Sequence, residues 1–380
     1  MSKTIKIVMA TLLLVLSLGL SFGAGCTVGT STATGLDLGL DVVEEAWGII
    51  FQDYVDKSRL DAGVLSGAAI KGMVEAIDDP YTAYLEVEAY KMSVESLEGK
   101  YEGIGAYVGF ENEQVVIIAP ITGSPAAKAG IQAGDIILAV DGIPTSGMSV
   151  QEVVPYIRGP KGAPVLLLIL HQGETEPEEI EVVRDEVEVS SVHFEMMEDI
   201  AYININHFTE RTDGELSSAL ESMNQEGATG IVLDLRRNPG GLLDVVIDVA
   251  GHFLDEGVVT SVVNNRGEQT SLSVEPGGIF TDLPVVVLSD NYSASGSEVL
   301  AGALQDHARA TIAGAQTYGK GSVNTLNRLQ DGSGLYITTA RWLTPDGHMI
   351  EGEGISPDHE LDLKEVDAIQ WAIDYLESNT

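Results

Sequence analysis

Residues 285–298 read Val-Val-Val-Leu-Ser-Asp-Asn-Tyr-Ser-Ala-Ser-Gly-Ser-Glu, and this stretch decides the fold of the chain. Its first five residues predict a β-strand, and the residues from Glu298 to Asp306 predict an α-helix. A turn between a strand and a helix can present a serine at the helix N-terminus, where free backbone N–H groups stabilise negative charge. The stretch therefore predicts an α/β layer with a candidate nucleophilic serine at its turn.

The same alternation of strands and helices extends in both directions from this turn, over residues 189–380. The expected strands are Ala201–Ile205, Ile231–Leu235, Val258–Val263 and Val285–Ser289, and the expected helices are Asp213–Asn224, Leu242–Phe253 and Glu298–Asp306. Alternation of this kind is typical of a layered α/β core. We expect residues 189–380 to form that core together with a C-terminal extension.

The preceding segment, residues 98–188, is predicted to be a compact β-module. The expected strands are Ile104–Val108, Val115–Ile118, Ile136–Val140, Val165–Leu170 and Ile180–Val183, with short helices at Ser124–Ala129 and Ser149–Ile157. This order of strands and helices, with Gly134-Asp135-Ile136-Ile137-Leu138 and Asp141-Gly142, resembles a PDZ domain.

The substrate-binding residues of this module are expected at Gly103, Ile104, Gly105 and Ala106. Glycines free the backbone N–H groups there to turn inward as an anion-binding nest, and the following strand can accept an extended peptide. In a PDZ domain the carboxylate-binding loop occupies this position. A glycine-rich hairpin would also explain Gly103 and Gly105 taken alone.

Residues 37–97 are predicted to form a helical N-terminal domain with no chemistry of its own. Apolar residues recur at helical spacing from Val42 to Ile50 and again from Leu65 to Ile77. Asp79-Pro80 ends the second helix, because the residue before a proline disfavours the α region. A third amphipathic segment runs from Glu86 to Leu97.

The first 26 residues have the pattern of an export signal. Lys3 and Lys6 precede an apolar run, Ile7–Phe22, that is too short for a comfortable membrane span. Gly23-Ala24-Gly25-Cys26 resembles a bacterial lipobox, with Cys26 as the lipid attachment site, and residues 27–36 read as a flexible linker. We expect a lipid-anchored protein on the extracytoplasmic face of a bacterial membrane, with ordinary signal cleavage or an uncleaved anchor as alternatives.

The net charge and the cysteine and histidine content disfavour several classes of function. The chain carries 58 acidic and 20 basic residues, a formal net charge of −38, so phosphate backbones and anionic lipid headgroups would repel it. Its single cysteine leaves no internal disulfide, and its seven histidines include no metalloprotease His-Glu-x-x-His pair. We expect no metal and no nucleic-acid partner.

The glycine-flanked Lys320 is a second candidate for chemistry. Gly314 to Gly321 nearly spells a phosphate-binding P-loop, but Gly321 stands where a magnesium-binding Ser or Thr is required. A lysine can instead act as a general base, because burial disfavours its charged form and lowers its pKa. A Ser–Lys pair is a recognised variant of the serine triad.

Further motifs occur in a fixed order along the chain. They are Leu235–Leu243 (Leu-Arg-Arg-Asn-Pro-Gly-Gly-Leu-Leu), Ser293–Glu298, Ala301–Asp306 and Thr317–Gly321, with Asp79–Leu85 and Gly354–Asp358 towards the ends. Over about residues 37–362 this order resembles the C-terminal processing peptidase family, also called tail-specific proteases. The resemblance implies a ClpP/crotonase-like α/β protease core with a PDZ domain, and no metal or organic cofactor.

The resemblance also implies which residues act. In the family the middle serine of the serine-rich stretch is the nucleophile, and a lysine follows twenty-five positions later, as Ser295 and Lys320 do here. Ser293 and Ser297 do not have this spacing, and they suit a turn and an N-cap.

Two oxyanion donors and a lysine-orienting residue are implied as well. The donors are the backbone N–H groups of Gly296, which stands where alanine is common, and of Gly240. Asn324 stands where the family usually has a glutamine that orients the lysine, and its side chain is one methylene shorter. We expect partial reach from Asn324 to Lys320, because the glycines around the lysine let its loop shift.

The function expected from these features is that of an exported serine endopeptidase. It would cleave protein substrates near their C-termini after the PDZ domain has captured a free apolar C-terminus. The resemblance leaves an adaptor protein and a homo-oligomer open. One rival is a catalytically silent binding protein, for which Asn324 is the only support. A trypsin-like PDZ protease would need a Gly-x-Ser-Gly-Gly string, which the sequence lacks.

Overall fold

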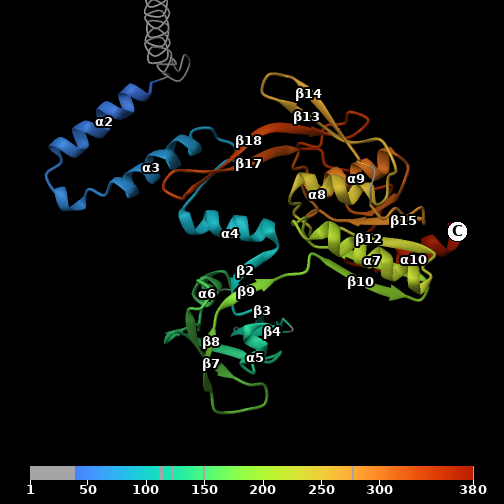
Figure 1. Ribbon diagram of the computed structural model, residues 1–380, viewed down its shortest axis with the longest axis horizontal. Helices are drawn as coiled ribbons and strands as arrows, with labels where there is room; N and C mark the ends of the chain where they lie inside the picture. The colour runs from blue at the N-terminus through green and yellow to red at the C-terminus, as the bar shows by residue number, and fades with distance from the viewer. Residues whose placement is uncertain (1–38, 112–113, 122, 149, 276–277, 380) are drawn as a thin grey trace, which may run out of the picture. The chain divides into compact units, whose positions relative to one another are not determined.

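The computed structural model describes residues 39–379 except 112–113, 122, 149 and 276–277 (Figure 1). The chain divides into two compact units, Met1–Ala69 and Ile70–Thr380. The predicted signal and Cys26, and the linker at 27–36, lie outside the described residues. No helix in the described part of the chain has the length and apolar character that crossing a membrane requires.

The described part of the first unit is helical, as predicted. It contains α2 (Leu40–Asp53) and the short 3₁₀ helix η1 (Lys57–Arg59), and α3 (Ala62–Glu75) begins in it and continues into the second unit. No residue of α2 or α3 is buried. Trp47 and Phe51, one turn apart on α2, stack with their ring centroids 5.0 Å apart.

The start of the second unit differs from the prediction of helices alone. Helix α4 (Val87–Glu98) is the third predicted helix, but β1 (Ala83–Leu85) precedes it and pairs antiparallel with β18 (Gly334–Leu343). Residues 83–85 are therefore part of a core sheet. The cause is a pairing between segments far apart in the sequence, which local periodicity does not reveal.

Residues 100–188 form the predicted β-module. The chain enters it through β2 (Lys100–Gly103) and leaves through β9 (Asp185–Glu188), which pair with each other. The main sheet has the order β3–β4–β5–β7–β8, with β6 paired to β5, so β3 is an edge strand. The strands are β3 (Ala106–Glu111), β4 (Gln114–Pro120), β5 (Ile136–Val140), β6 (Ile143–Pro144), β7 (Pro164–Leu170) and β8 (Glu178–Val183), and the helices are α5 (Pro125–Lys128) and α6 (Val150–Ile157).

Residues 192–379 form the predicted α/β core. Its main sheet has the order β10–β11–β12–β15–β16–β19; β10 is antiparallel to β11 and the other pairs are parallel. These strands are β10 (Val192–Met197), β11 (Ile200–Ile205), β12 (Gly230–Asp234), β15 (Val285–Ser289), β16 (Thr311–Gly314) and β19 (His359–Glu360). The helices are α7 (Thr212–Glu226), α8 (Leu243–Gly251), α9 (Gly296–Asp306) and α10 (Ala368–Asn379).

A second sheet completes the core. It has the order β1–β18–β13–β14, with β17 also paired to β18. Its further strands are β13 (Val258–Asn264), β14 (Gln269–Ser273) and β17 (Ser322–Arg328). The segment 258–263, predicted as a strand of the layered core, thus belongs to this antiparallel sheet.

The central strands of the main sheet are covered on both faces. Alternate residues of β15 belong to two apolar clusters: Val285 and Val287 to the one that includes residues of α7, α8 and α9, and Val286 and Leu288 to the one that includes residues of α10. A parallel strand covered on both faces reads as a continuous apolar run, which is why residues 285–289 indicate the core so clearly. The turn after β15 therefore starts at the end of a rigid, buried strand.

Candidate active site

The turn between β15 and α9 holds Ser295 in a strained backbone conformation. Its φ is 53° and its ψ is −113°, a combination that residues other than glycine rarely adopt. Asp290 stabilises the turn, because its Oδ1 accepts the backbone N–H groups of Tyr292 and Ser293, each at 3.0 Å. Ser295 is the N-cap of α9, so the backbone N–H of Gly296, the first residue of the helix, lies beside it.

The structure separates the three candidate serines by what their hydroxyls donate to. Ser293 is fully buried and donates to the Leu235 carbonyl at 2.9 Å, and Ser297 is fully buried and donates to the Asn238 carbonyl at 2.9 Å. The Ser295 hydroxyl donates to no acceptor among the described residues, and Ser295 lines a cavity of about 570 Å³. Ser295 is therefore the serine whose hydroxyl proton is available to a base.

Glu298 joins the serine turn to the lysine loop. Its fully buried carboxylate accepts four hydrogen bonds: Oε2 from the N–H groups of Ser295 (2.8 Å) and Lys320 (2.9 Å), and Oε1 from the Thr317 hydroxyl and the Gly319 N–H (both 2.6 Å). Burial raises the pKa of Glu298, and these hydrogen bonds oppose the rise. Sequence analysis assigned Glu298 no role, although the spacing of Ser295 and Glu298 is that of a capping box.

Lys320 lies in surroundings that favour a neutral amine. Burial lowers its pKa, against the carboxylates of Glu298, Glu351 and Asp79, which act to raise it. Its Nζ lies 5.3 Å from the ring centre of Tyr81. It also lies 5.7 Å from that of Tyr336, and it has no hydrogen bond or salt bridge with the described residues. Neither tyrosine was predicted from the sequence to lie near Lys320, because the pairing of β1 with β18 forms only in the folded chain.

Asn324 is occupied elsewhere. Its amide nitrogen donates to the Tyr81 carbonyl and to the Thr338 hydroxyl, both at 3.0 Å, and its Oδ1 accepts from Ser322 at 3.1 Å. The expected contact with Lys320 is not among the hydrogen bonds of the described residues. Asn324 instead fixes the main chain at Tyr81, whose ring faces the lysine amine, and its catalytic role stays a prediction.

The two implied oxyanion donors differ. Gly240 packs against the serine turn so closely that a Cβ at that position would lie 2.8 Å from the Ser295 Cβ, and its φ is 104°. Its N–H, however, donates to Asn238 Oδ1 at 2.8 Å and is not free. The N–H groups of Gly296 and Gly241 donate to no acceptor in the described chain, and Gly241 lines the Ser295 cavity. In this structure the free donor of the loop is therefore Gly241 and not Gly240.

The predicted peptide-binding loop lies next to the edge strand β3. Gly103 ends β2, Ile104 is buried in the module's core, and Ala106 begins β3. Gly105 has φ 74°, and a Cβ there would lie 2.4 Å from the Ser124 Cβ, so this position requires glycine.

One cavity lies at this loop and another at Ser295. One, of about 350 Å³, is lined by residues of β3 and α6, among them Ala106, Val108 and Ile157. Ser96, Arg158 and His207 line both this cavity and that of Ser295. The two cavities therefore share part of their lining.

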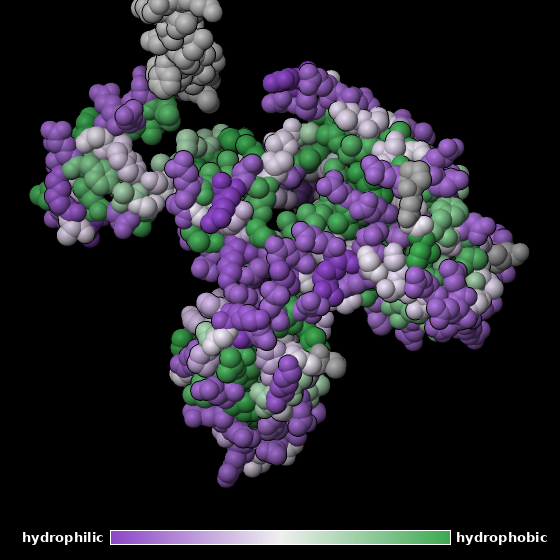
Figure 2. Space-filling model, in the orientation of Figure 1, coloured by the Kyte–Doolittle hydropathy of each residue, from purple (hydrophilic) through white to green (hydrophobic). Residues whose placement is uncertain are grey.

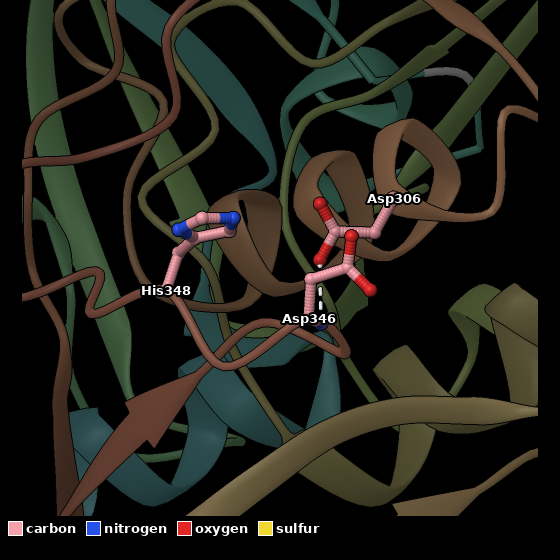
Figure 3. A group of neighbouring side chains, drawn as sticks. All are labelled: Asp306, Asp346 and His348. Atoms are coloured by element: carbon pink, nitrogen blue, oxygen red, sulfur yellow. Dashed lines mark hydrogen bonds between the residues drawn. The ribbon is translucent and has the colours of Figure 1, made fainter.

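One group of side chains in the described chain has metal-ligand spacing. Figure 3 shows Asp306, Asp346 and His348, whose ligand atoms lie within 4.8 Å of one another. Asp306 Oδ2 accepts the Asp346 N–H at 2.9 Å, and Asp346 and His348 are exposed. None of the three lines the Ser295 cavity, and the group adds nothing to the candidate site.

Comparisons with known proteins match each part of this architecture. Family models match as Peptidase family S41 at residues 199–361, PDZ domain at 116–170 and Activating protease CtpB N-terminal domain at 28–89. The solved structure of the photosystem II D1 C-terminal processing protease is 30% identical and superposes with a TM-score of 0.52, covering 87% of this chain and 95% of that one.

The sequences of curated relatives align with most of the chain. A probable CtpA-like serine protease of Staphylococcus haemolyticus is 40% identical over 322 residues, 84% of this chain and 64% of that protein, so the chain spans just under two thirds of its length. The carboxy-terminal-processing protease of Bartonella bacilliformis is 41% identical over 298 residues, 76% of this chain and 68% of that protein. The chain therefore belongs to the C-terminal processing peptidase family, within peptidase family S41.

Proposed function

We propose that this protein is an exported serine endopeptidase that cleaves protein substrates near their C-termini, with Ser295 as nucleophile and Lys320 as base. The observation that carries the proposal is the Glu298 carboxylate, one oxygen of which accepts the backbone N–H groups of both residues. The two loops are thereby held together. The Ser295 hydroxyl has a proton to give, and burial lowers the pKa of the lysine that would take it.

The chemistry follows from these positions. The neutral Lys320 amine takes the proton of Ser295 as its oxygen attacks the substrate carbonyl. Backbone N–H groups stabilise the negative charge on the tetrahedral intermediate, and we assign this role to Gly296 and Gly241, because Gly240 donates to Asn238. Protonated Lys320 then gives its proton to the leaving amine, and water hydrolyses the acyl-enzyme. No step requires a metal or an organic cofactor.

Capture of the substrate C-terminus is assigned to the PDZ domain. The free edge of β3 can pair with an extended peptide, and the loop before β3 can bind its carboxylate through backbone N–H groups. Residues upstream of the captured end would then extend from the cavity at the PDZ domain towards Ser295, since the two cavities have three lining residues in common. An adaptor protein and self-association are compatible with this arrangement but are not required by it.

Export and lipid anchoring rest on the sequence of the first 26 residues. The charged start, the apolar run and Cys26 support a lipoprotein on the extracytoplasmic face of a bacterial membrane. The full chain expressed in a bacterial host should fractionate with membranes and take up labelled fatty acid, and Cys26→Ala should remove the label. Equal labelling of both forms would refute attachment at Cys26.

Proteolysis is tested by cleavage of an unfolded polypeptide by the purified protein. Wild type should release fragments, whereas Ser295→Ala and Lys320→Ala should each abolish cleavage, because nucleophile and base act as a unit. Ser218→Ala is the matched control, since Ser218 is exposed on α7 and its hydroxyl donates to the Gly214 carbonyl, far from the proposed site in the sequence. Cleavage by Ser295→Ala at the wild-type rate would exclude the proposed nucleophile.

A further inference from the structure

A third cavity, of about 640 Å³, adjoins the candidate active site. Its lining includes Lys320, Ala294, Arg237, Tyr81, Tyr292 and Tyr318. Ala294 directly precedes Ser295, so the cavity opens beside the proposed nucleophile. Tyr81 lines this cavity and Tyr336 lines the Ser295 cavity, and the Lys320 amine lies near both rings. We call it the Arg237 cavity.

Hydrogen bonds from backbone N–H groups fix the loops around the Arg237 cavity. Asp290 Oδ1 accepts the N–H of Arg237 and the N–H of Tyr292, each at 3.0 Å. The Tyr318 N–H donates to the Ser293 carbonyl at 3.0 Å. Arg237 has φ 62°, a left-handed conformation that the contact with Asp290 helps to hold. The side chains at the rim therefore project from anchored main chain.

The guanidinium of Arg237 has no ion-pair partner within the described chain. Its guanidinium forms no salt bridge or hydrogen bond with the described residues, whereas that of the neighbouring Arg236 binds Asp234 at 2.6 Å. None of the residues lining the Arg237 cavity is acidic. Tyr292 and Tyr318 are 64% and 57% exposed, and both side chains border the cavity. An exposed, unpaired guanidinium among tyrosines suits an anionic group, and the anionic side chains of a protein substrate are carboxylates.

We propose that the Arg237 cavity is a specificity subsite that binds an acidic side chain of the substrate. The inference rests on the proposed function and adds the substrate class. The cavities also indicate which side of the cleaved bond this subsite binds. The cavity at the PDZ domain shares lining residues with the Ser295 cavity, but it shares none with the Arg237 cavity. If the PDZ domain holds the substrate C-terminus, the Arg237 cavity receives a residue on the N-terminal, acyl side of the cleaved bond.

Peptide substrates test this with the full-length protein. All would share one apolar C-terminus, and Glu, Gln or Lys would be placed in turn at each of the first few positions on the acyl side and, for comparison, on the leaving side. Arg237→Asn and Arg237→Asp are the informative variants, because Asn and Asp tolerate left-handed backbone and differ mainly in charge. Arg266→Asn, in the turn between β13 and β14, removes the same charge at a site that does not line the cavity.

Wild type and Arg266→Asn should prefer Glu over Gln at one acyl-side position by about tenfold in kcat/KM, the size expected of one charged hydrogen bond. Arg237→Asn should lose this preference while still cleaving the Gln peptide, and Arg237→Asp should prefer Lys. Equal kcat/KM for Glu and Gln at every acyl-side position would overturn the subsite, and so would a preference that survives Arg237→Asn. Absence of Ser295-dependent cleavage from all peptides would instead refute the proposed function itself.

Discussion

Lys320 is partly buried and lies near three carboxylates. Burial lowers the pKa of its amine, whereas the negative charge of the carboxylates raises it. Burial is the larger effect and disfavours the charged amine, while Glu298, Glu351 and Asp79 favour it. Since only the neutral amine can accept the Ser295 proton, kcat/KM should rise with pH through a pKa below the ~10.4 of a free lysine. A rate that is flat or falls from mildly acidic to mildly alkaline pH would argue against lysine as the base.

Glu351 offers a sharper version of this test. Its charge raises the pKa of Lys320, and its buried Oε2 accepts no hydrogen bond among the described residues, although Arg341 lies 3.7 Å away. Glu351→Gln should therefore lower the pKa of Lys320 and move the rising limb of the pH profile to lower pH. Glu353→Gln, an exposed change two residues away, is the control. A shift to higher pH, or the same shift in both variants, would contradict the assignment.

At the scale of elements, the loop before β3 determines whether the PDZ domain can hold a carboxylate. Gly105 and Gly142 both have positive φ, 74° and 78°, but a Cβ meets Ser124 at the first and nothing within 4 Å at the second. A peptide with a free apolar C-terminus should bind wild type and Gly142→Ala more tightly than its amide does. Gly105→Ala should lose this difference, measured by fluorescence anisotropy. Equal binding of acid and amide by wild type would exclude the carboxylate loop.

How much of these elements the sequence predicts depends on the range of the contacts involved. The strand at 285–289, the turn to α9 and the strands of the PDZ domain depend on local apolar patterns, so they could be predicted from the residues alone. The pairing of β1 with β18 is long-range, and it brings Tyr81 and Tyr336 to Lys320.

The hydrogen-bond partners inside the site also could not be predicted from the sequence. The motif that contains Gly240 predicted a loop close to Ser295, and the structure has it there. Which N–H of that loop is free depends on Asn238, whose side chain takes the Gly240 N–H. The partners of Asn324 likewise come from β18 and the loop before β1.

At the scale of the whole molecule, we expect the net negative charge to lower the stability of the folded state. Figure 2 shows hydrophilic residues over much of the visible face of the PDZ domain, and the chain carries a net charge of −38. Repulsion between like charges should destabilise the folded state at low salt, where the Debye length is ~30 Å, and weaken at ~0.15 M salt, where it is ~8 Å.

The melting temperature should therefore rise with added sodium chloride at pH 7. The rise should be smaller near pH 4, where many carboxylates become protonated. Differential scanning calorimetry measures both. A melting temperature that falls with salt at pH 7 would show that attractive ion pairs outweigh the repulsion.

The most direct test of the catalytic assignment is to trap the nucleophile covalently. A fluorophosphonate reacts fastest with an activated serine, so mass spectrometry after brief labelling should place the main adduct on Ser295 in the wild type. Lys320→Ala should label far more slowly at the same pH, and Ser295→Ala should not label in the 290–298 segment at all. An adduct on Ser293 or Ser297, or equal labelling rates for wild type and Lys320→Ala, would contradict a Ser295–Lys320 dyad.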